Sequence, residues 1–294
     1  MKFCLHFGNI AYPDPEDAKR MALAAEAAGF ESVIAVEHIV IPTNYSTRYP
    51  YAESGRLPGG VDMPWPEPLT WLTYVGAVTE RLRLVTGVMV LPQRNPLILA
   101  KHAATIDHMT GGRLELGIGV GWLREEFDAL GVPFERRGAR ANEYIEAMRA
   151  LWDGDDASYR GAFVSFEGAS CNPKPANGRV PIIVGGNSKP AIRRAGRYGD
   201  GYFPATGAAS TDVAEIIEAM RAEARAAGRD PAEIDVMAGC PDALPGSGKD
   251  PLAAVAARAN AGVSRVVLPL AAFEADLEGM LADFGEKVIR PLNG

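Results

Sequence analysis

The chain has few cysteines and no long apolar run. Its 294 residues include three cysteines, Cys4, Cys171 and Cys240, which are odd in number and far apart. This spacing does not build a disulfide framework and suits a reducing compartment, so we expect a cytoplasmic protein. No apolar run approaches the roughly 20 residues of a membrane span. The first one, ending at Gly8, is too short for a signal peptide.

A run of positive charge is also missing. The net charge is −7, and lysine and arginine are scattered along the chain. A nucleic-acid-binding surface usually shows clustered basic residues, and so does a basic membrane-binding face. We therefore expect neither nucleic acid nor membrane as a partner, and a small molecule as the substrate.

Several catalytic motifs are absent as well. The sequence has no paired Cys/His spacing for a metal, no lysine at a strand end for a Schiff base, and no Gly-x-Ser-x-Gly elbow. We predict no metal site. The remaining polar residues suit an enzyme whose cofactor carries the reactive atom.

What the sequence does contain is a regular alternation of short apolar runs and amphipathic helical patterns, which is typical of βα units around a parallel sheet. Eight strands are predicted, each followed by a helix: 2–8, 32–36, 83–90, 113–118, 181–184, 201–204, 234–239 and 264–268. Eight such units close into a (β/α)8 TIM barrel in one domain, 1–294. A doubly wound open sheet is the alternative.

Two segments exceed a minimal barrel. Residues 39–66, after the second strand, form a long loop rich in proline, glycine and aromatic residues. Loops of this length are usually functional lids or disordered. Residues 126–179, between the fourth and fifth strands, contain a predicted helix at 143–152 and a strand-like stretch at 158–166. Both segments are interpreted as insertions.

The fourth predicted strand runs into glycines at alternate positions, Gly117, Gly119 and Gly121, followed by Trp122. Glycine is favoured where backbone closely approaches a ligand, although it also marks turns and bulges. This pattern leaves room for a large flat molecule. Trp122 either stacks on such a ring or belongs to the core, and the sequence leaves both open.

A second glycine-rich site follows the fifth strand at Gly185, Gly186, Asn187 and Ser188, just before a helix. Free N–H groups at a helix N-terminus favour phosphate. The alternative is a tight turn with an Asn or Ser N-cap.

Active sites of such barrels lie at the carboxyl ends of the strands. His38, at the end of the second strand, is the candidate for proton transfer, because its ordinary pKa lies near neutrality. The alternative is that Glu37 and His38 only cap the strand. His6, in the first strand, is expected to face the lumen of the barrel. Other residues at strand ends are Gln93, Arg94, Thr206 and Asp242, whereas Glu125 and Glu126 are interpreted as structural.

The sequence resembles the bacterial-luciferase-like oxidoreductase superfamily, with the coenzyme F420-dependent branch as the closest match. The resemblance extends over nearly the whole chain and lies in residues 30–33, 37–38, 83–88, 95–96, 100–101, 110–114, 117–122 and 185–187.

The resemblance implies a barrel that binds a flavin or deazaflavin at its mouth. A bulge at Thr86, Gly87 and Val88, with a cis peptide at Gly87–Val88, would support the central ring. The glycines of the two loops and Asn187 would hold the side chain and phosphate, and His38 would lie beside the reactive face. A homodimer is also implied. Related dehydrogenases carry a glutamate just after the strand-four glycines, where this chain has Trp122, so a sugar-phosphate substrate is not indicated.

Three functions are therefore compared. The first is an F420-dependent oxidoreductase that transfers a hydride between the deazaflavin and a small organic substrate. The second is an FMN-dependent monooxygenase on the same architecture. The third is a non-redox barrel that has lost its cofactor.

Overall fold

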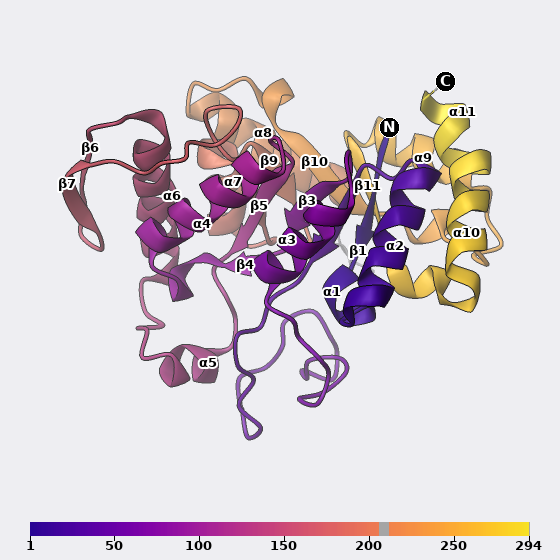
Figure 1. The fold of residues 1–294 in the computed structure, drawn as a ribbon, viewed down its shortest axis with the longest axis horizontal. Coiled ribbons are helices and arrows are strands. Elements are labelled where there is room, and N and C mark those ends of the chain that lie inside the picture. The colour runs from indigo at the N-terminus through magenta and orange to yellow at the C-terminus, as the bar shows by residue number, and fades with distance from the viewer. Residues whose placement is uncertain (206–211, 294) are drawn as a thin grey trace.

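A computed structural model describes residues 1–205 and 212–293. Thr206, one of the residues predicted at a strand end, lies outside the described residues. The described chain forms a closed parallel barrel surrounded by helices (Figure 1). The predicted (β/α)8 fold is thereby confirmed.

Each barrel strand pairs with its neighbours in parallel, in the order β3-β2-β1-β11-β10-β9-β8-β5, and pairing of β3 with β5 closes the ring. The barrel strands are β1 (Lys2–His6), β2 (Ser32–Ala35), β3 (Arg83–Thr86), β4 (Met89–Val90), β5 (Leu114–Gly119), β8 (Ile182–Gly185), β9 (Gly201–Phe203), β10 (Asp235–Gly239) and β11 (Arg265–Pro269).

The third barrel strand is interrupted, whereas the sequence predicted one continuous strand at 83–90. It consists of β3 and β4, and both pieces pair with β5. Gly87 and Val88 lie between the pieces, and the peptide bond that joins them is cis. The Thr86 hydroxyl donates to the Gly117 carbonyl at 2.8 Å, which holds the end of β3 against β5.

Helices follow every barrel strand and cover the outside of the ring. They are α1 (Gly8–Ala11), α2 (Pro15–Ala28), α3 (Pro68–Val78), α4 (Pro96–Met109), α5 (Arg124–Ala129), α6 (Arg137–Asp153), α7 (Lys189–Tyr198), α8 (Val213–Ala226), α9 (Pro251–Asn260), α10 (Leu277–Phe284) and α11 (Arg290–Asn293). Shorter 3-10 turns are η1 (Leu91–Gln93), η2 (Pro231–Glu233), η3 (Pro241–Ala243) and η4 (Leu270–Asp276), and η5 (Gly285–Ile289) is a π-helical turn. No helix of the described residues is long and apolar enough to cross a membrane.

The insertion between β5 and β8 differs in detail from the prediction. Helix α6 begins six residues before the predicted 143–152 helix. The stretch predicted as one strand is an antiparallel hairpin of β6 (Ala157–Arg160) and β7 (Ser165–Ala169). The Glu143 carboxylate accepts the backbone N–H groups of the hairpin turn at residues 162, 163 and 164, so the hairpin is fastened to α6.

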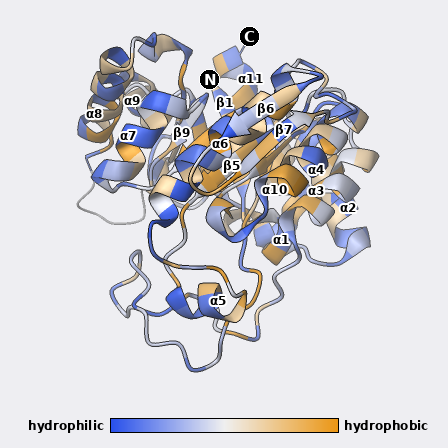
Figure 2. Cartoon of the chain, turned by 90° about the vertical axis from the view of Figure 1, so that its left-hand side faces the viewer, coloured by the Kyte–Doolittle hydropathy of each residue, from blue (hydrophilic) through white to orange (hydrophobic). Residues whose placement is uncertain are grey.

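The barrel interior is filled. Its middle layer consists of apolar side chains from six strands: Cys4, Ile34, Val85, Ile183, Met237 and Val267. At the amino end of the strands, Arg265 pairs with Glu115 at 2.6 Å and with Asp235 at 2.8 Å. The strands around β5 are mostly apolar in Figure 2, in agreement with this burial. A ligand can therefore enter the barrel only at the carboxyl ends of the strands. We call this end of the barrel the mouth.

Candidate functional site

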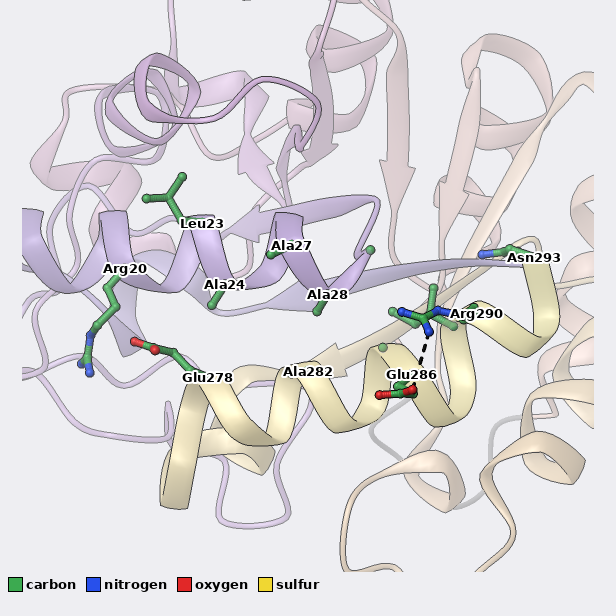
Figure 3. A pocket seen from close by; sticks show the side chains of 13 residues that line it. Arg20, Leu23, Ala24, Ala27, Ala28, Glu278, Ala282, Glu286, Arg290 and Asn293 are labelled. Atoms are coloured by element: carbon green, nitrogen blue, oxygen red, sulfur yellow. Dashed lines mark ion pairs between the residues drawn. The ribbon is translucent and has the colours of Figure 1, made fainter.

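The mouth brings the sequence-predicted residues together. Figures 1 and 2 both show the 39–66 loop and α5 projecting from this end of the barrel. A separate groove of about 880 Å³ lies on the outside, between α2 and α10 (Figure 3). Alanines and the Arg290–Glu286 ion pair line this groove, and none of the predicted site residues does.

The glycines of β5 and β8 are explained first by the packing of the protein itself. A Cβ added to Gly117 would lie 1.7 Å from the Thr86 carbonyl oxygen. A Cβ at Gly119 or Gly185 would lie 2.8 or 2.6 Å from a methyl group of Val88. The bare main chain therefore makes room for the interrupted third strand, with Val88 between two glycines. Contact of these glycines with a ligand stays a prediction.

His6 supports the interruption from inside the barrel. Its Nε2 lies 3.2 Å from the Gly87 carbonyl oxygen, and its ring packs against Phe7 and Phe203. Burial lowers the pKa of His6 to about 4, so the ring is neutral at physiological pH. A neutral imidazole with its proton on Nε2 donates to this carbonyl.

His38 is paired with Glu126. The His38 Nδ1 atom and the Glu126 Oε2 atom are 3.1 Å apart, and both side chains are more than nine-tenths buried. Burial opposes ionisation of Glu126, but hydrogen bonds from His38 and from the Ile39 N–H outweigh it and lower the pKa of Glu126. An ionised carboxylate only accepts, so Nδ1 carries a proton and Nε2 is left for another partner.

Glu37 belongs to a second ion pair. Its carboxylate accepts the Val90 N–H at 2.6 Å and the Arg94 guanidinium, whose other partner is Glu67 at 2.8 Å. Burial raises the pKa of Glu37. Glu37 thus fixes the end of β4, and of the two neighbouring residues only His38 remains available for proton transfer.

The 39–66 loop is described throughout and closes over the mouth. Glu125 Oε1 accepts the Ser46 N–H at 2.7 Å, and Glu125 Oε2 accepts the Thr47 hydroxyl at 2.7 Å. Glu126 Oε1 accepts the Ile39 N–H at 2.7 Å. Two adjacent carboxylates of α5 therefore anchor this loop.

Trp122 packs with the loop. Its ring lies 5.7 Å from Tyr45, 5.1 Å from Tyr49 and 5.8 Å from His38, all edge to face. Trp65 lies 5.1 Å from the His38 ring on another side. Trp122 is half-buried in this aromatic cluster and does not belong to the barrel core.

In the second glycine loop, the amide of Asn187 is used internally. It donates to the Ala205 carbonyl at 2.6 Å and accepts the Ala205 N–H at 2.8 Å, which ties the loop to the end of β9. Ser188 caps α7 by accepting the Ala191 N–H, and Gly186 has a φ of +105°. The side chains of Asn187 and Ser188 therefore stabilise a tight turn and cap a helix, as in the second interpretation of the sequence. Within the described residues, the main-chain N–H groups of Ser188 and Lys189 have no partner.

Two features were not foreseen from the sequence. Glu126 is the partner of His38 although 88 residues separate them. Gln93, in η1, has an almost fully buried side chain without a hydrogen-bond partner in the structure. Both depend on packing between distant segments, and no local pattern signals them.

Groups of three or more candidate metal ligands are not found in the part of the chain that the structure describes. Its three cysteines are free and buried.

The fold and this mouth define a class of proteins. Residues 3–277 match the family described as luciferase-like monooxygenase, and the chain belongs to that family. Its members are oxidoreductases or monooxygenases.

Particular relatives cover most of the chain. An uncharacterized protein of Mycobacterium tuberculosis is 34% identical over 77% of this chain and 80% of its own length. The F420-dependent glucose-6-phosphate dehydrogenase of Mycolicibacterium gilvum is 32% identical over 76% of this chain and 63% of its own. The FMNH2-dependent dimethylsulfone monooxygenase of Pseudomonas fluorescens is 31% identical over 71% and 52%.

Solved structures share the fold. The monooxygenase RslO1 of Streptomyces bottropensis superposes with a TM-score of 0.77 at 23% identity, covering 99% of this chain and 100% of its own. The coenzyme F420-dependent tetrahydromethanopterin reductase of Methanopyrus kandleri does so with a TM-score of 0.74 at 20% identity, covering 98% of each chain.

Proposed function

We propose that this protein is an F420-dependent oxidoreductase that acts on a small organic substrate under the 39–66 loop. The observation that carries the proposal is the buried His38–Glu126 pair at the mouth, which leaves Nε2 of a fixed imidazole available. Relatives that depend on F420 or FMNH2 support a flavin or deazaflavin as the cofactor.

The residues present fit such a group. The N–H groups of Ser188 and Lys189, at the start of α7, have no partner among the described residues and suit a phosphate. Half-buried Val88, between Gly119 and Gly185, would lie beside the ring. When bound, a deazaflavin supplies two-electron hydride chemistry, and the protein contributes position and electrostatics.

The role proposed for His38 is to hold or accept a proton at Nε2. Glu126 fixes the ring orientation through Nδ1 and stabilises the positive charge that forms when Nε2 takes up a proton. The aromatic side chains around Trp122 exclude water from this position.

The FMN-dependent monooxygenase is the second candidate, since a monooxygenase relative matches at nearly the same identity as the F420-dependent one. A barrel without any cofactor is the third.

Equilibrium titration with F420 and with oxidised and reduced FMN tests the proposal. We expect F420 to bind, and His38→Ala to lower turnover by about 100-fold or more at unchanged F420 affinity. His102→Ala, on the exposed face of α4, is the matched control and should change neither. Binding of FMN alone would support the monooxygenase, binding of neither would support the cofactor-free barrel, and full turnover of His38→Ala would refute the role of His38.

A further inference from the structure

Two buried polar groups whose hydrogen-bonding capacity is unsatisfied within the described residues flank the His38–Glu126 pair. Gln93 is 8% exposed, and its amide lies close enough to the Glu126 carboxylate to lower the pKa of Glu126, but among the described residues neither its Oε1 nor its Nε2 has a partner in hydrogen-bond geometry. The Trp65 Nε1 atom is likewise buried and unpartnered. Native proteins rarely leave buried polar atoms unsatisfied without a role for them, so both groups point to a ligand.

Both groups lie beside the proposed catalytic residues. Gln93 ends η1, directly after β4 at the mouth, and its side chain neighbours the Glu126 carboxylate. The Trp65 ring stands edge to face with the His38 ring, 5.1 Å between centroids. The amide, the indole N–H and His38 Nε2 therefore belong to one small region under the loop.

The two carboxylates nearest to this region, those of Glu37 and Glu126, are already paired. Glu126 is bound to His38, and Glu37 is bound to Arg94. The groups left over are neutral: an amide that can donate and accept, an indole donor and one imidazole nitrogen. A site of this kind recognises a neutral oxygen function, because the Glu126 carboxylate beside His38 would repel an anion bound there.

We propose that Gln93 and Trp65 form a substrate subsite for a small neutral molecule with a hydroxyl or carbonyl oxygen. This inference rests on the proposed function. Gln93 and Trp65 bind the oxygen and orient it toward His38 Nε2, and the subsite selects against phosphorylated or carboxylated substrates.

The experiment measures binding of three probes of equal ring size, cyclohexanol, cyclohexanone and cyclohexanecarboxylate, to the full-length protein with and without bound cofactor, by ligand-observed NMR. We expect the wild-type protein to bind the two neutral probes more tightly than the carboxylate. Gln93→Leu, which keeps the shape and removes the hydrogen bonds, should weaken binding of both neutral probes by about tenfold. Trp65→Phe, which removes the indole N–H and keeps an aromatic ring beside His38, should also weaken binding of the neutral probes, and Asn260→Leu, on α9, is the control that should change nothing.

Unchanged probe affinity in Gln93→Leu and Trp65→Phe, or tighter binding of the carboxylate by the wild-type protein, would overturn the inference. Circular dichroism checks that each variant folds, and either variant alone suffices for the test. If Gln93 acted only through Glu126, its replacement would shift the pH profile and leave probe affinity unchanged, which also refutes the subsite. F420 affinity measured on the same samples separates the proposed function from the proposed subsite. If the wild-type protein does not bind F420, that result counts only against the proposed function.

Discussion

The sharpest test of the barrel architecture is the replacement of Gly117 by alanine. The new Cβ would lie 1.7 Å from the Thr86 carbonyl oxygen, whereas carbon–oxygen contacts in proteins are about 3.3 Å or longer. The obstacle is backbone, so β3 and β5 would have to separate. That separation disrupts the Thr86–Gly117 hydrogen bond. We expect a loss of more than about 4 kcal/mol in the free energy of unfolding, a large part of the stability of an ordinary domain.

The matched control is Gly154→Ala. Gly154 has a φ of −133°, and a Cβ there would meet nothing within 4 Å. This substitution should leave stability unchanged or raise it by up to about 1 kcal/mol, since alanine restricts the unfolded chain. Urea unfolding followed by circular dichroism compares the two variants. Equal midpoints for Gly117→Ala and Gly154→Ala would refute the packing explanation of the glycines.

Gly119 offers an intermediate case, because a Cβ there meets a side chain and not backbone. Its nearest neighbour would be a Val88 methyl at 2.8 Å. Gly119→Ala should cost about 1–3 kcal/mol, as overpacking does. Val88→Ala in the same chain should remove most of that cost, and additive effects of the two substitutions would contradict the proposed contact.

Three further predictions concern buried or anchored charges. Arg94→Met leaves the Glu37 carboxylate buried without its partner and should cost about 3–5 kcal/mol in urea unfolding; Glu37→Gln in the same chain should restore part of it. Although burial opposes it, hydrogen bonds from Thr47 and Ser46 lower the pKa of Glu125 from 4.5 to about 2. The stabilisation of the loop by these hydrogen bonds should be complete above pH 4.5 and be lost as the pH falls toward 2. Protection of the loop amides from hydrogen exchange measures this loss, and Glu125→Gln should abolish the pH dependence. Burial lowers the pKa of His6 from 6.5 to about 4. Between these pH values the unfolded state binds more protons than the folded state, so the free energy of unfolding should fall as the pH is lowered from 6.5 to 4. The same dependence of the free energy of unfolding on pH in His6→Gln would contradict the lowered pKa of His6.

Much of the barrel could be predicted because its signal is local. Apolar runs of strand length alternate with amphipathic helices, and all eight predicted strands are found in the structure. The interruption of the third strand was not predicted from periodicity, since residues 83–90 read as one apolar run. The Gly87–Val88 geometry was anticipated only through the family resemblance.

The site was predictable in position and less so in its contacts. Strand ends identified His38 and the two glycine loops, because parallel strands bring their carboxyl ends together. Asn187 bonds Ala205, and Glu37 bonds Arg94. Both contacts depend on which residues the fold brings within hydrogen-bond distance. Sequence spacing carries no information on such contacts.

The dual carboxylate anchor on α5 has an evolutionary consequence. Two stretches of chain, 39–66 and the short helix that begins at Arg124, are joined by Glu125 and Glu126 and form one structural unit at the mouth. A graft of a foreign loop without its own helix would remove the Ser46 and Thr47 donors that face Glu125. New specificities in barrels of this kind should therefore arise when both stretches are inherited together.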